Sequence, residues 1–212
     1  MINSNIIQVL KSSSNFDELM AHINNSIAGE AHCLDDLSKM NNKKLVGDMW
    51  ERFCALYLKN SKKFVDVFLW RDFPFLNYPQ IPKITDHGID IICVTKSGQL
   101  VAVQCKYRHT KTGVVGWREL STFYSLALKL GCFDELIVMT SGKYVKYITR
   151  LDNETSLCYR NFSKLNSMDF LELCGCSAKE IDKNVLPSET QKLSLEELRQ
   201  YRLAYYKNNL QI

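Results

Sequence analysis

The chain has 212 residues and a net charge of +4, and its hydrophobic and charged fractions of 46% and 24% are those of an ordinary globular protein. With 9 glycines and 4 prolines, it is neither collagen-like nor of low complexity. No apolar run reaches the roughly 20 residues of a membrane-spanning helix, and the N-terminus lacks the basic start and apolar core of a signal peptide. We therefore expect an intracellular protein without a membrane segment.

Eight cysteines raise the question of a disulfide framework or a structural zinc site. Cys54, Cys93 and Cys105 lie within apolar runs, where a free cysteine behaves as a small hydrophobic residue. The chain has no C-x-x-C pair, and the two closest cysteines, Cys174 and Cys176, are separated by one residue. Reduced, buried thiols are therefore favoured over a zinc site.

Residues 1–43 are expected to form an N-terminal helical cap. Asn15 is a candidate N-cap, because Glu18 follows three positions later and apolar residues then recur at helical spacing. The apolar positions of residues 44–59 also follow the i, i+3, i+4, i+7 pattern, which predicts an amphipathic helix. Glu51 adjoins the apolar stripe of this second helix.

The middle of the chain alternates between strand-like and helical patterns. A strand or strand-like bend is expected within residues 64–75, and prolines break up the loop that follows. Residues 89–95 and 100–106 are rich in aliphatic side chains and flank the glycine-containing turn 96–99, which predicts an antiparallel hairpin. A helix is expected over residues 115–130, closed by a glycine.

The last third of the core is expected to complete a sheet. We predict a short buried strand at residues 136–140, a helix at 144–150, a strand at 156–159 and a helix at 167–174. Residues 177–212 read as a polar linker followed by an amphipathic C-terminal helix. The expected fold class is therefore α/β, with a mixed central β-sheet flanked by helices.

Three polar side chains are expected to meet at one end of the hairpin. Because side chains alternate along a strand, Gln104 and Lys106 project to one face, and the turn brings Asp90 beside Gln104. A carboxylate and an amide oxygen are ligands that Mg²⁺ accepts, and the backbone carbonyl of Cys105 offers another. Glu51 can add a second carboxylate from its helix.

The lysine completes a set suited to phosphodiester hydrolysis. Lys106 would lie close to the phosphate and the attacking water, where its charge offsets the negative charge of the transition state. The bland interpretation is a turn aspartate and a solvated strand face. Against it, an apolar Val-Ala-Val run before Gln104 indicates a buried strand that ends abruptly in polar groups.

The ordered set Glu51, Gly88-Ile89-Asp90 and Gln104-Cys105-Lys106 resembles the core motif of the PD-(D/E)XK restriction-endonuclease-like superfamily. Within it, the chain is most similar to the Mrr-like enzymes and to nuclease domains attached to helicases. The resemblance covers residues 44–174 and implies a nuclease domain over residues 44–176. It implies Asp90 and Gln104 as metal ligands, Lys106 as the catalytic lysine and Glu51 as the acid on the helix. Gln104 departs from the acidic residue of the general motif, so one metal or two is left open.

Basic and aromatic residues follow the catalytic strand. Tyr107, Arg108, His109 and Lys111 are candidates for contacts with nucleic-acid phosphates, and Lys62 is a further candidate. A charge run is also often only a solvated face, so the cluster gains weight from its place beside the motif.

The function expected from these residues is that of an Mg²⁺-dependent DNA endonuclease, with Mn²⁺ as a substitute ion. A free-standing enzyme would work as a homodimer, and a domain of a larger protein would work with a helicase or recognition module. The alternatives are a nucleic-acid-binding module that does not cut, and an interaction domain without this chemistry. The pattern leaves DNA versus RNA, the preferred DNA structure and any sequence preference open.

Overall fold

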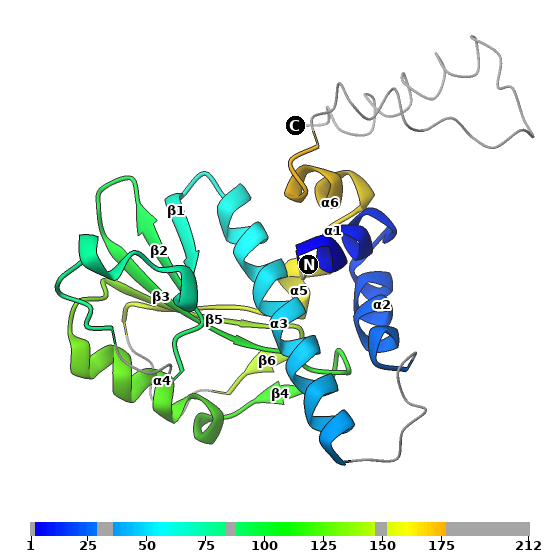
Figure 1. Cartoon of the computed structure of the whole chain (residues 1–212), viewed down its shortest axis with the longest axis horizontal. Helices are drawn as coiled ribbons and strands as arrows, with labels where there is room; N and C mark the ends of the chain where they lie inside the picture. The colour runs from blue at the N-terminus through cyan, green and yellow to red at the C-terminus, as the bar shows by residue number, and fades with distance from the viewer. Residues whose placement is uncertain (1–2, 29–35, 84–87, 147–151, 177–212) are drawn as a thin grey trace, which may run out of the picture. The chain divides into compact units, whose positions relative to one another are not determined.

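A mixed five-stranded sheet forms the centre of the part that the structure, a computed structural model, describes (Figure 1). The described residues are 3–28, 36–83, 88–146 and 152–176. The strands, in their order across the sheet, are β1 Phe64–Leu69, β2 Ile91–Thr95, β3 Leu100–Lys106, β5 Glu135–Thr140 and β7 Glu154–Leu157. The first three strands are antiparallel, whereas β3, β5 and β7 run parallel. This confirms the α/β class with a mixed sheet.

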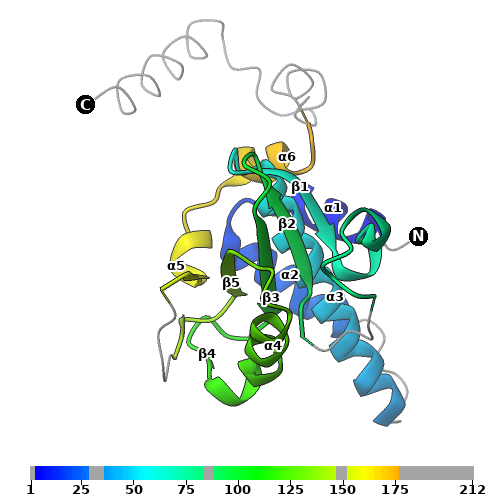
Figure 2. The same cartoon turned by 90° about the vertical axis from the view of Figure 1, so that its left-hand side faces the viewer.

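The two faces of the sheet carry separate apolar cores. Side chains of β2 and β3 alternate, so that Cys93, Val101 and Val103 join the core beneath helix α3 (Asp36–Asn60). Ile92 and Ala102 join the core beneath helix α4 (Trp117–Leu130). Figure 2 shows α3 and α4 on different sides of the strands, with α4 seen nearly end-on. Burial on both faces explains why the strands read as continuous apolar runs in the sequence.

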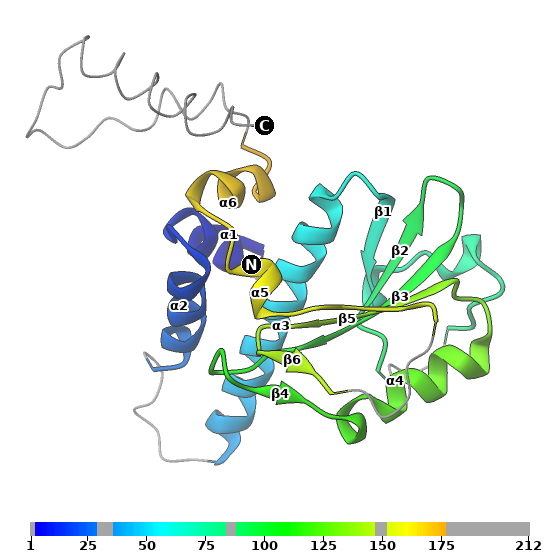
Figure 3. The same ribbon diagram turned by 180° about the vertical axis from the view of Figure 1, so that it is seen from behind.

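The remaining helices gather on the α3 side (Figure 3). They are α1 Asn3–Lys11, α2 Phe16–Ala28, α5 Tyr159–Phe162 and α6 Ser167–Leu173. An aromatic cluster joins them to α3: the ring of Trp50 lies 5.1 Å from that of Phe53, 5.5 Å from Phe162 and 6.2 Å from Phe16. The indole N–H of Trp50 also donates to the Met139 carbonyl at 3.4 Å. This packing fixes the helix turn that carries the next residue, Glu51.

Several predicted boundaries shift. The helix expected at residues 44–59 begins at Asp36 and ends at Asn60. The strand expected within residues 64–75 ends at Leu69 and is followed by two short 3₁₀ turns, η1 Trp70–Asp72 and η2 Phe75–Asn77. The hairpin is confirmed, with Ile91 opposite Val103 and Val94 opposite Leu100.

One predicted element is wrong at its start. Residues 144–150 were expected to be helical, but Tyr144–Val145 form strand β6, which pairs in parallel with strand β4 (Val114–Val115). The amide of Lys143 donates to the Gly113 carbonyl at 2.7 Å, and that of Lys146 donates to Val115 at 2.8 Å. These backbone groups therefore bond to another segment instead of to the next helical turn. Residues 147–151 lie outside the described part.

The described residues belong to one compact unit that extends to Cys176, and the helix expected within residues 177–212 lies outside them. The division of the chain at residue 43 stays a prediction. The seven cysteines that the structure describes are all free thiols. Within the same part of the chain, no helix is long and apolar enough to cross a membrane.

Candidate active site

Asp90 stands immediately before β2, where backbone hydrogen bonds hold it from both sides. Its amide donates to the Val103 carbonyl at 2.9 Å, and its carbonyl accepts the Trp70 amide at 2.8 Å. The neighbouring strands β3 and β1 thus continue their ladders past the end of β2. The side chain of Asp90 is therefore presented from a fixed backbone at the edge of the sheet.

Gly88 approaches helix α4 more closely than any side chain permits. Its φ is +117°, and a Cβ atom there would lie 3.0 Å from Thr122 Oγ1, 3.1 Å from the Phe123 amide nitrogen and 3.3 Å from Gln104 Oε1. Only glycine adopts this backbone conformation without strain. The glycine of the Gly-Ile-Asp motif is thus required by a positive φ and by the contact with α4.

The carboxylate of Asp90 and the amide of Gln104 are in direct contact. Asp90 Oδ2 accepts hydrogen bonds from the Cys105 backbone amide at 2.6 Å and from Gln104 Nε2. Gln104 Nε2 also donates to the Cys105 carbonyl at 3.3 Å. The structure therefore brings together Asp90, Gln104 and the Cys105 backbone, as the hairpin register predicts.

One atom of this cluster is left unsatisfied. Gln104 is only 2% exposed, and its Oε1 is buried without a hydrogen-bond partner among the residues that the structure describes. A buried polar atom without a partner costs about 1–3 kcal/mol, and such atoms in native proteins call for an explanation. An amide that turns over would direct Oε1 towards Asp90 and the Cys105 carbonyl, which is a set of oxygen ligands suited to Mg²⁺.

Lys106 is half-buried at the end of β3, on the same face as Gln104, and pairs in register with Thr140. Glu119, in the first turn of α4, lies close enough for the two charges to interact. Partial burial favours a raised pKa of Glu119, but hydrogen bonds from the Gly116 amide and Arg108, with the charge of Lys106, lower it overall. No motif in the sequence singles out Glu119. The only signal for it was its place three residues after Gly116, where an acidic side chain caps a helix.

Glu51 and Asp90 line one cavity of about 410 Å³ between α3 and the β1–η1 connection. The other lining residues are Lys44, Gly47, Asp48, Leu69, Trp70 and Arg71. We call this space the α3 cavity. Asp48 and Glu51 are both partly buried. The structure thus places Glu51 beside Asp90, and it adds Asp48, a carboxylate that lies outside the sequence motif.

A metal ion at this site would depend on mixed ligands. In the parts of the chain that are described, no three His, Cys, Asp or Glu side chains are grouped as a metal site by themselves. The oxygen donors available near Asp90 are instead an amide, a backbone carbonyl and the carboxylate of Glu51. Hard oxygen donors of this kind fit Mg²⁺ or Mn²⁺ better than the softer metals that thiolates bind.

A model of a restriction-endonuclease family, Mrr_cat_2, matches residues 58–168, which is more than half of the chain. The chain belongs to this restriction-endonuclease family. The matched residues include Gly88, Asp90, Gln104 and Lys106, together with α4 and β5. Glu51 and most of α3 precede the match, so family membership alone says nothing of them.

One solved structure with a similar arrangement is described as an ATP-dependent Type ISP restriction-modification enzyme, LlaBIII, bound to DNA. The sequence identity is 18% and the TM-score is 0.45. The similarity covers 79% of this chain but 11% of that chain, so this protein spans about a tenth of the length of that enzyme. No curated protein matches the chain in a sequence comparison.

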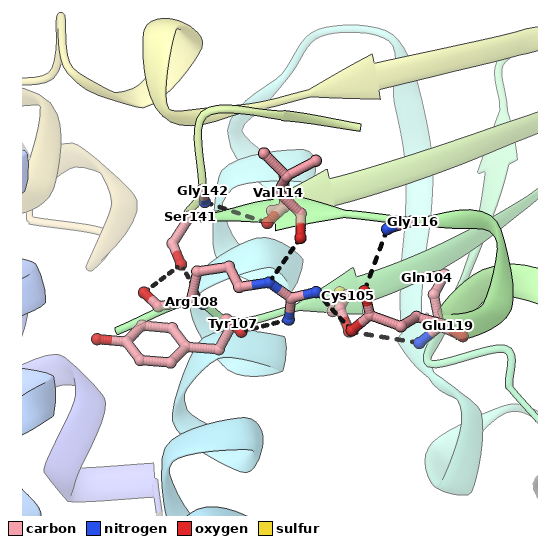
Figure 4. Close-up of polar contacts among 10 residues, drawn as sticks. Gln104, Cys105, Tyr107, Arg108, Val114, Gly116, Glu119, Ser141 and Gly142 are labelled. Atoms are coloured by element: carbon pink, nitrogen blue, oxygen red, sulfur yellow. Dashed lines mark hydrogen bonds and ion pairs between the residues drawn. The ribbon is translucent and has the colours of Figure 1, made fainter. Parts of the chain in front are cut away.

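In this restriction-endonuclease domain, Arg108 is engaged by its own surroundings (Figure 4). Its guanidinium donates to the Val114 carbonyl at 3.2 Å, to the Tyr107 carbonyl at 3.0 Å and to Glu119 Oε1 at 2.5 Å. Its backbone amide donates to Ser141 Oγ at 2.7 Å. Arg108 therefore connects the end of β3 to α4, and its predicted contact with phosphate stays a prediction.

The other residues after β3 are held by helix α2. Tyr107 Oη donates to Asn24 Oδ1 at 3.0 Å, and His109 Nδ1 lies 2.9 Å from the same oxygen. Lys111 Nζ donates to Asp17 Oδ2 at 3.3 Å, which raises the pKa of Lys111. Burial raises the pKa of Tyr107 far above its usual value. Contacts of these three residues with nucleic acid stay predictions.

Lys62 is not brought to this site. It is exposed in the connection between α3 and β1, next to the pair Phe64–Thr95, whereas Asp90 adjoins the pair Leu69–Ile91 at the other end of the same strands. A role of Lys62 in binding nucleic acid stays a prediction.

Proposed function

We propose that this restriction-endonuclease domain hydrolyses phosphodiester bonds of DNA with Mg²⁺, or with Mn²⁺ in its place. The observation that carries the proposal is the contact between Asp90 and Gln104 at the end of β2 and β3, together with the buried, unpartnered Oε1 of Gln104. Both features fall within the residues that match the family. A turn aspartate and a solvated strand face would leave no such buried amide oxygen.

The residues of the site would have different roles in the reaction. Asp90, Gln104 and the Cys105 carbonyl would hold the ion, with Glu51 as a further carboxylate at the edge of the α3 cavity. A divalent ion held there would supply Lewis-acid chemistry at the scissile phosphate. Lys106 would donate hydrogen bonds to a phosphate oxygen and offset the charge that develops as water attacks phosphorus. Glu119, whose pKa is lowered in part by the charge of Lys106, places a negative charge near this lysine.

The orientation of Gln104 supports a site that rearranges slightly on loading. Gln104 Nε2 faces the Asp90 carboxylate, and an amide N–H group is not a metal ligand. To serve as a metal ligand, Gln104 would have to turn its amide oxygen towards the site. The side-chain amide of Gln104 can rotate in this way, because no hydrogen bond to a described residue holds its Oε1 atom in place.

The test is cleavage of supercoiled plasmid, linear duplex, single strands, a branched junction and RNA, with Mg²⁺, Mn²⁺ or EDTA. Asp90→Asn is the informative variant, because its side-chain oxygen still accepts the Cys105 amide while the charge is lost. Asp152→Asn, at an exposed position, is the matched control. We expect metal-dependent cutting of DNA by the wild type and the control only. Cutting that persists in Asp90→Asn, or that needs no divalent ion, would refute the proposal.

The same assay separates the remaining alternatives. Binding of DNA without cutting under every condition would favour a nucleic-acid-binding module, and cutting of RNA alone would change the substrate. Association with a second copy of the chain, or with a helicase or recognition domain, stays a prediction. The intracellular location of the protein also stays a prediction.

A further inference from the structure

The α3 cavity has two basic residues on its walls that the proposed catalytic set does not use. Lys44, Asp48 and Glu51 line it at positions i, i+4 and i+7 of α3, which is one face of a helix. Arg71 lines it from the 3₁₀ turn that follows β1. The cavity therefore has cations from two different elements beside the carboxylates of the candidate metal site.

These cations are available to an anionic ligand. Lys44 is exposed and makes no ion pair or hydrogen bond with any residue that the structure describes. The described partner of Arg71 is Asp72 at 4.0 Å, and their side chains are 48% and 65% exposed. An exposed ion pair at that distance is worth little, so a phosphate can replace it at small cost.

The turn that carries Arg71 is fixed relative to the catalytic residues. The amide of Trp70, its neighbour, donates to the Asp90 carbonyl at 2.8 Å, and the Trp70 side chain is buried in the core beneath α4. On the other wall, seven residues of helix place Lys44 about 10 Å from Glu51 along the α3 axis. At that separation the flexible Lys44 side chain lies beyond the metal site. There it can contact the phosphate next to the scissile phosphate on the same strand.

The size of the cavity suits such a ligand. Its 410 Å³ falls within the range of about 300–1,000 Å³ of pockets that bind small ligands, and a single nucleotide is a ligand of this class. Gly47 has no side chain to fill the cavity, and the space beside it is open, because a Cβ atom added there would meet no other atom within 4 Å. The lining combines two cations with the carboxylates of Asp48, Glu51 and Asp90, and the cations can contact the sugar-phosphate backbone, which proteins bind without reading bases.

We propose that the α3 cavity binds the nucleotide next to the scissile bond and that Lys44 and Arg71 hold its phosphate. This inference rests on the proposed function, because the nucleotide is part of the strand that the site cuts. It assigns the two residues to substrate positioning rather than to the reaction itself. Neither lies within the residues 107–111 from which the sequence predicted most DNA contacts.

The experiment compares DNA binding by the full chain and by two double variants. Lys44→Ala with Arg71→Ala removes the proposed contacts. Lys59→Ala with Lys96→Ala removes the same amount of charge at exposed positions, one at the end of α3 and one in the β2–β3 turn. Affinity for a labelled duplex is measured in EDTA and in Ca²⁺ over a range of salt concentrations. The magnitude of the slope of log K against log salt falls by about 0.9 for each phosphate that is no longer neutralised, and the two residues hold one phosphate, so we expect a fall of about 1 in the first double variant alone.

A third variant, Gly47→Leu, fills the cavity without changing charge. We expect it to weaken DNA binding while the thermal stability is kept or raised, because leucine replaces a glycine inside a helix. A first double variant that binds with the affinity and slope of its control, or a Gly47→Leu protein that binds as the wild type does, overturns the assignment.

Cleavage by the wild type separates this outcome from failure of the proposed function. If the wild type cuts DNA with metal but the cavity variants bind as their controls, the function stands and the cavity assignment falls. If the wild type neither binds nor cuts any nucleic acid, both fall together.

Discussion

Replacing Gly88 with alanine should lower the free energy of unfolding by about 3 kcal/mol. A residue with a side chain held at a sparsely populated φ costs about 1–3 kcal/mol, and φ here is +117°. Overpacking adds about 1–3 kcal/mol, because the new Cβ would lie 3.0 Å from Thr122 Oγ1 and 3.1 Å from the Phe123 amide nitrogen. The threonine can rotate away, but the amide belongs to the backbone of α4. The third contact, 3.3 Å from Gln104 Oε1, predicts a loss of cleavage as well.

Two other glycines isolate these contributions. Gly98→Ala carries the strain of φ +80° without any atom within 4 Å, so we expect a loss of about 1–2 kcal/mol. Gly47→Ala has neither feature and lies inside α3, so it should raise stability by about 0.5–1 kcal/mol. Urea unfolding followed by tryptophan fluorescence, with equal m values, measures all three. If Gly88→Ala lowers the free energy of unfolding no more than Gly98→Ala does, the close approach of Gly88 to α4 does not add to the destabilisation.

Three further predictions concern side chains around the site. Asn24→Ala should speed hydrogen exchange in the segment after β3, because Asn24 Oδ1 accepts the hydroxyl of Tyr107; unchanged exchange would mean that α2 does not hold this segment. The pKa of Glu119 is lowered in the folded chain, so its stabilising contact with Arg108 is present above the ordinary value of 4.5 and lost as pH falls; Glu119→Gln should remove this part of the pH dependence of unfolding. Burial raises the pKa of Cys93 to about 12, whereas an unfolded thiol ionises near 9.0, so stability should fall as pH rises above 9.0, and Cys93→Ala should flatten this fall.

The hairpin and its polar residues were predictable because their pattern is local. Two continuous apolar runs, a glycine turn and an abrupt change from apolar to polar residues all lie within a short stretch, and pairing of the two strands then brings Asp90 to Gln104. The α4 helix was predictable for the same reason, since its apolar face repeats over many residues. Strands β4 and β6 were not, because two-residue strands carry no period and depend on a partner far along the chain.

Contacts between distant segments explain what else the sequence missed. Arg108 looks in the sequence like one of several cations after a strand, yet its guanidinium bonds to Glu119 and to two backbone carbonyls. Asn24 has no pattern that links it to Tyr107, although their side chains are hydrogen-bonded. Such pairs follow from packing of α2 against α3 and of α4 against the sheet, which local periodicity does not specify.

The same packing bears on whether residues 1–43 are a separable cap. Leu10, Phe16, Leu19 and Ile23 are at most 1% exposed and belong to the core that includes Trp50. Burying each such side chain contributes about 1.5–3 kcal/mol, so four contribute about 6–12 kcal/mol, which is comparable to the about 5–15 kcal/mol of a whole domain.

We therefore expect a chain lacking residues 1–28 to lose its cooperative thermal transition and to bind a hydrophobic dye, even though every residue of the candidate active site is retained. Circular dichroism and dye fluorescence measure this. A Phe16→Leu variant of the full chain, which keeps most of the buried area, should retain the transition at a lower temperature. A truncated chain that melts cooperatively near the full-length temperature would show that the N-terminal helices only cover a core that is already stable.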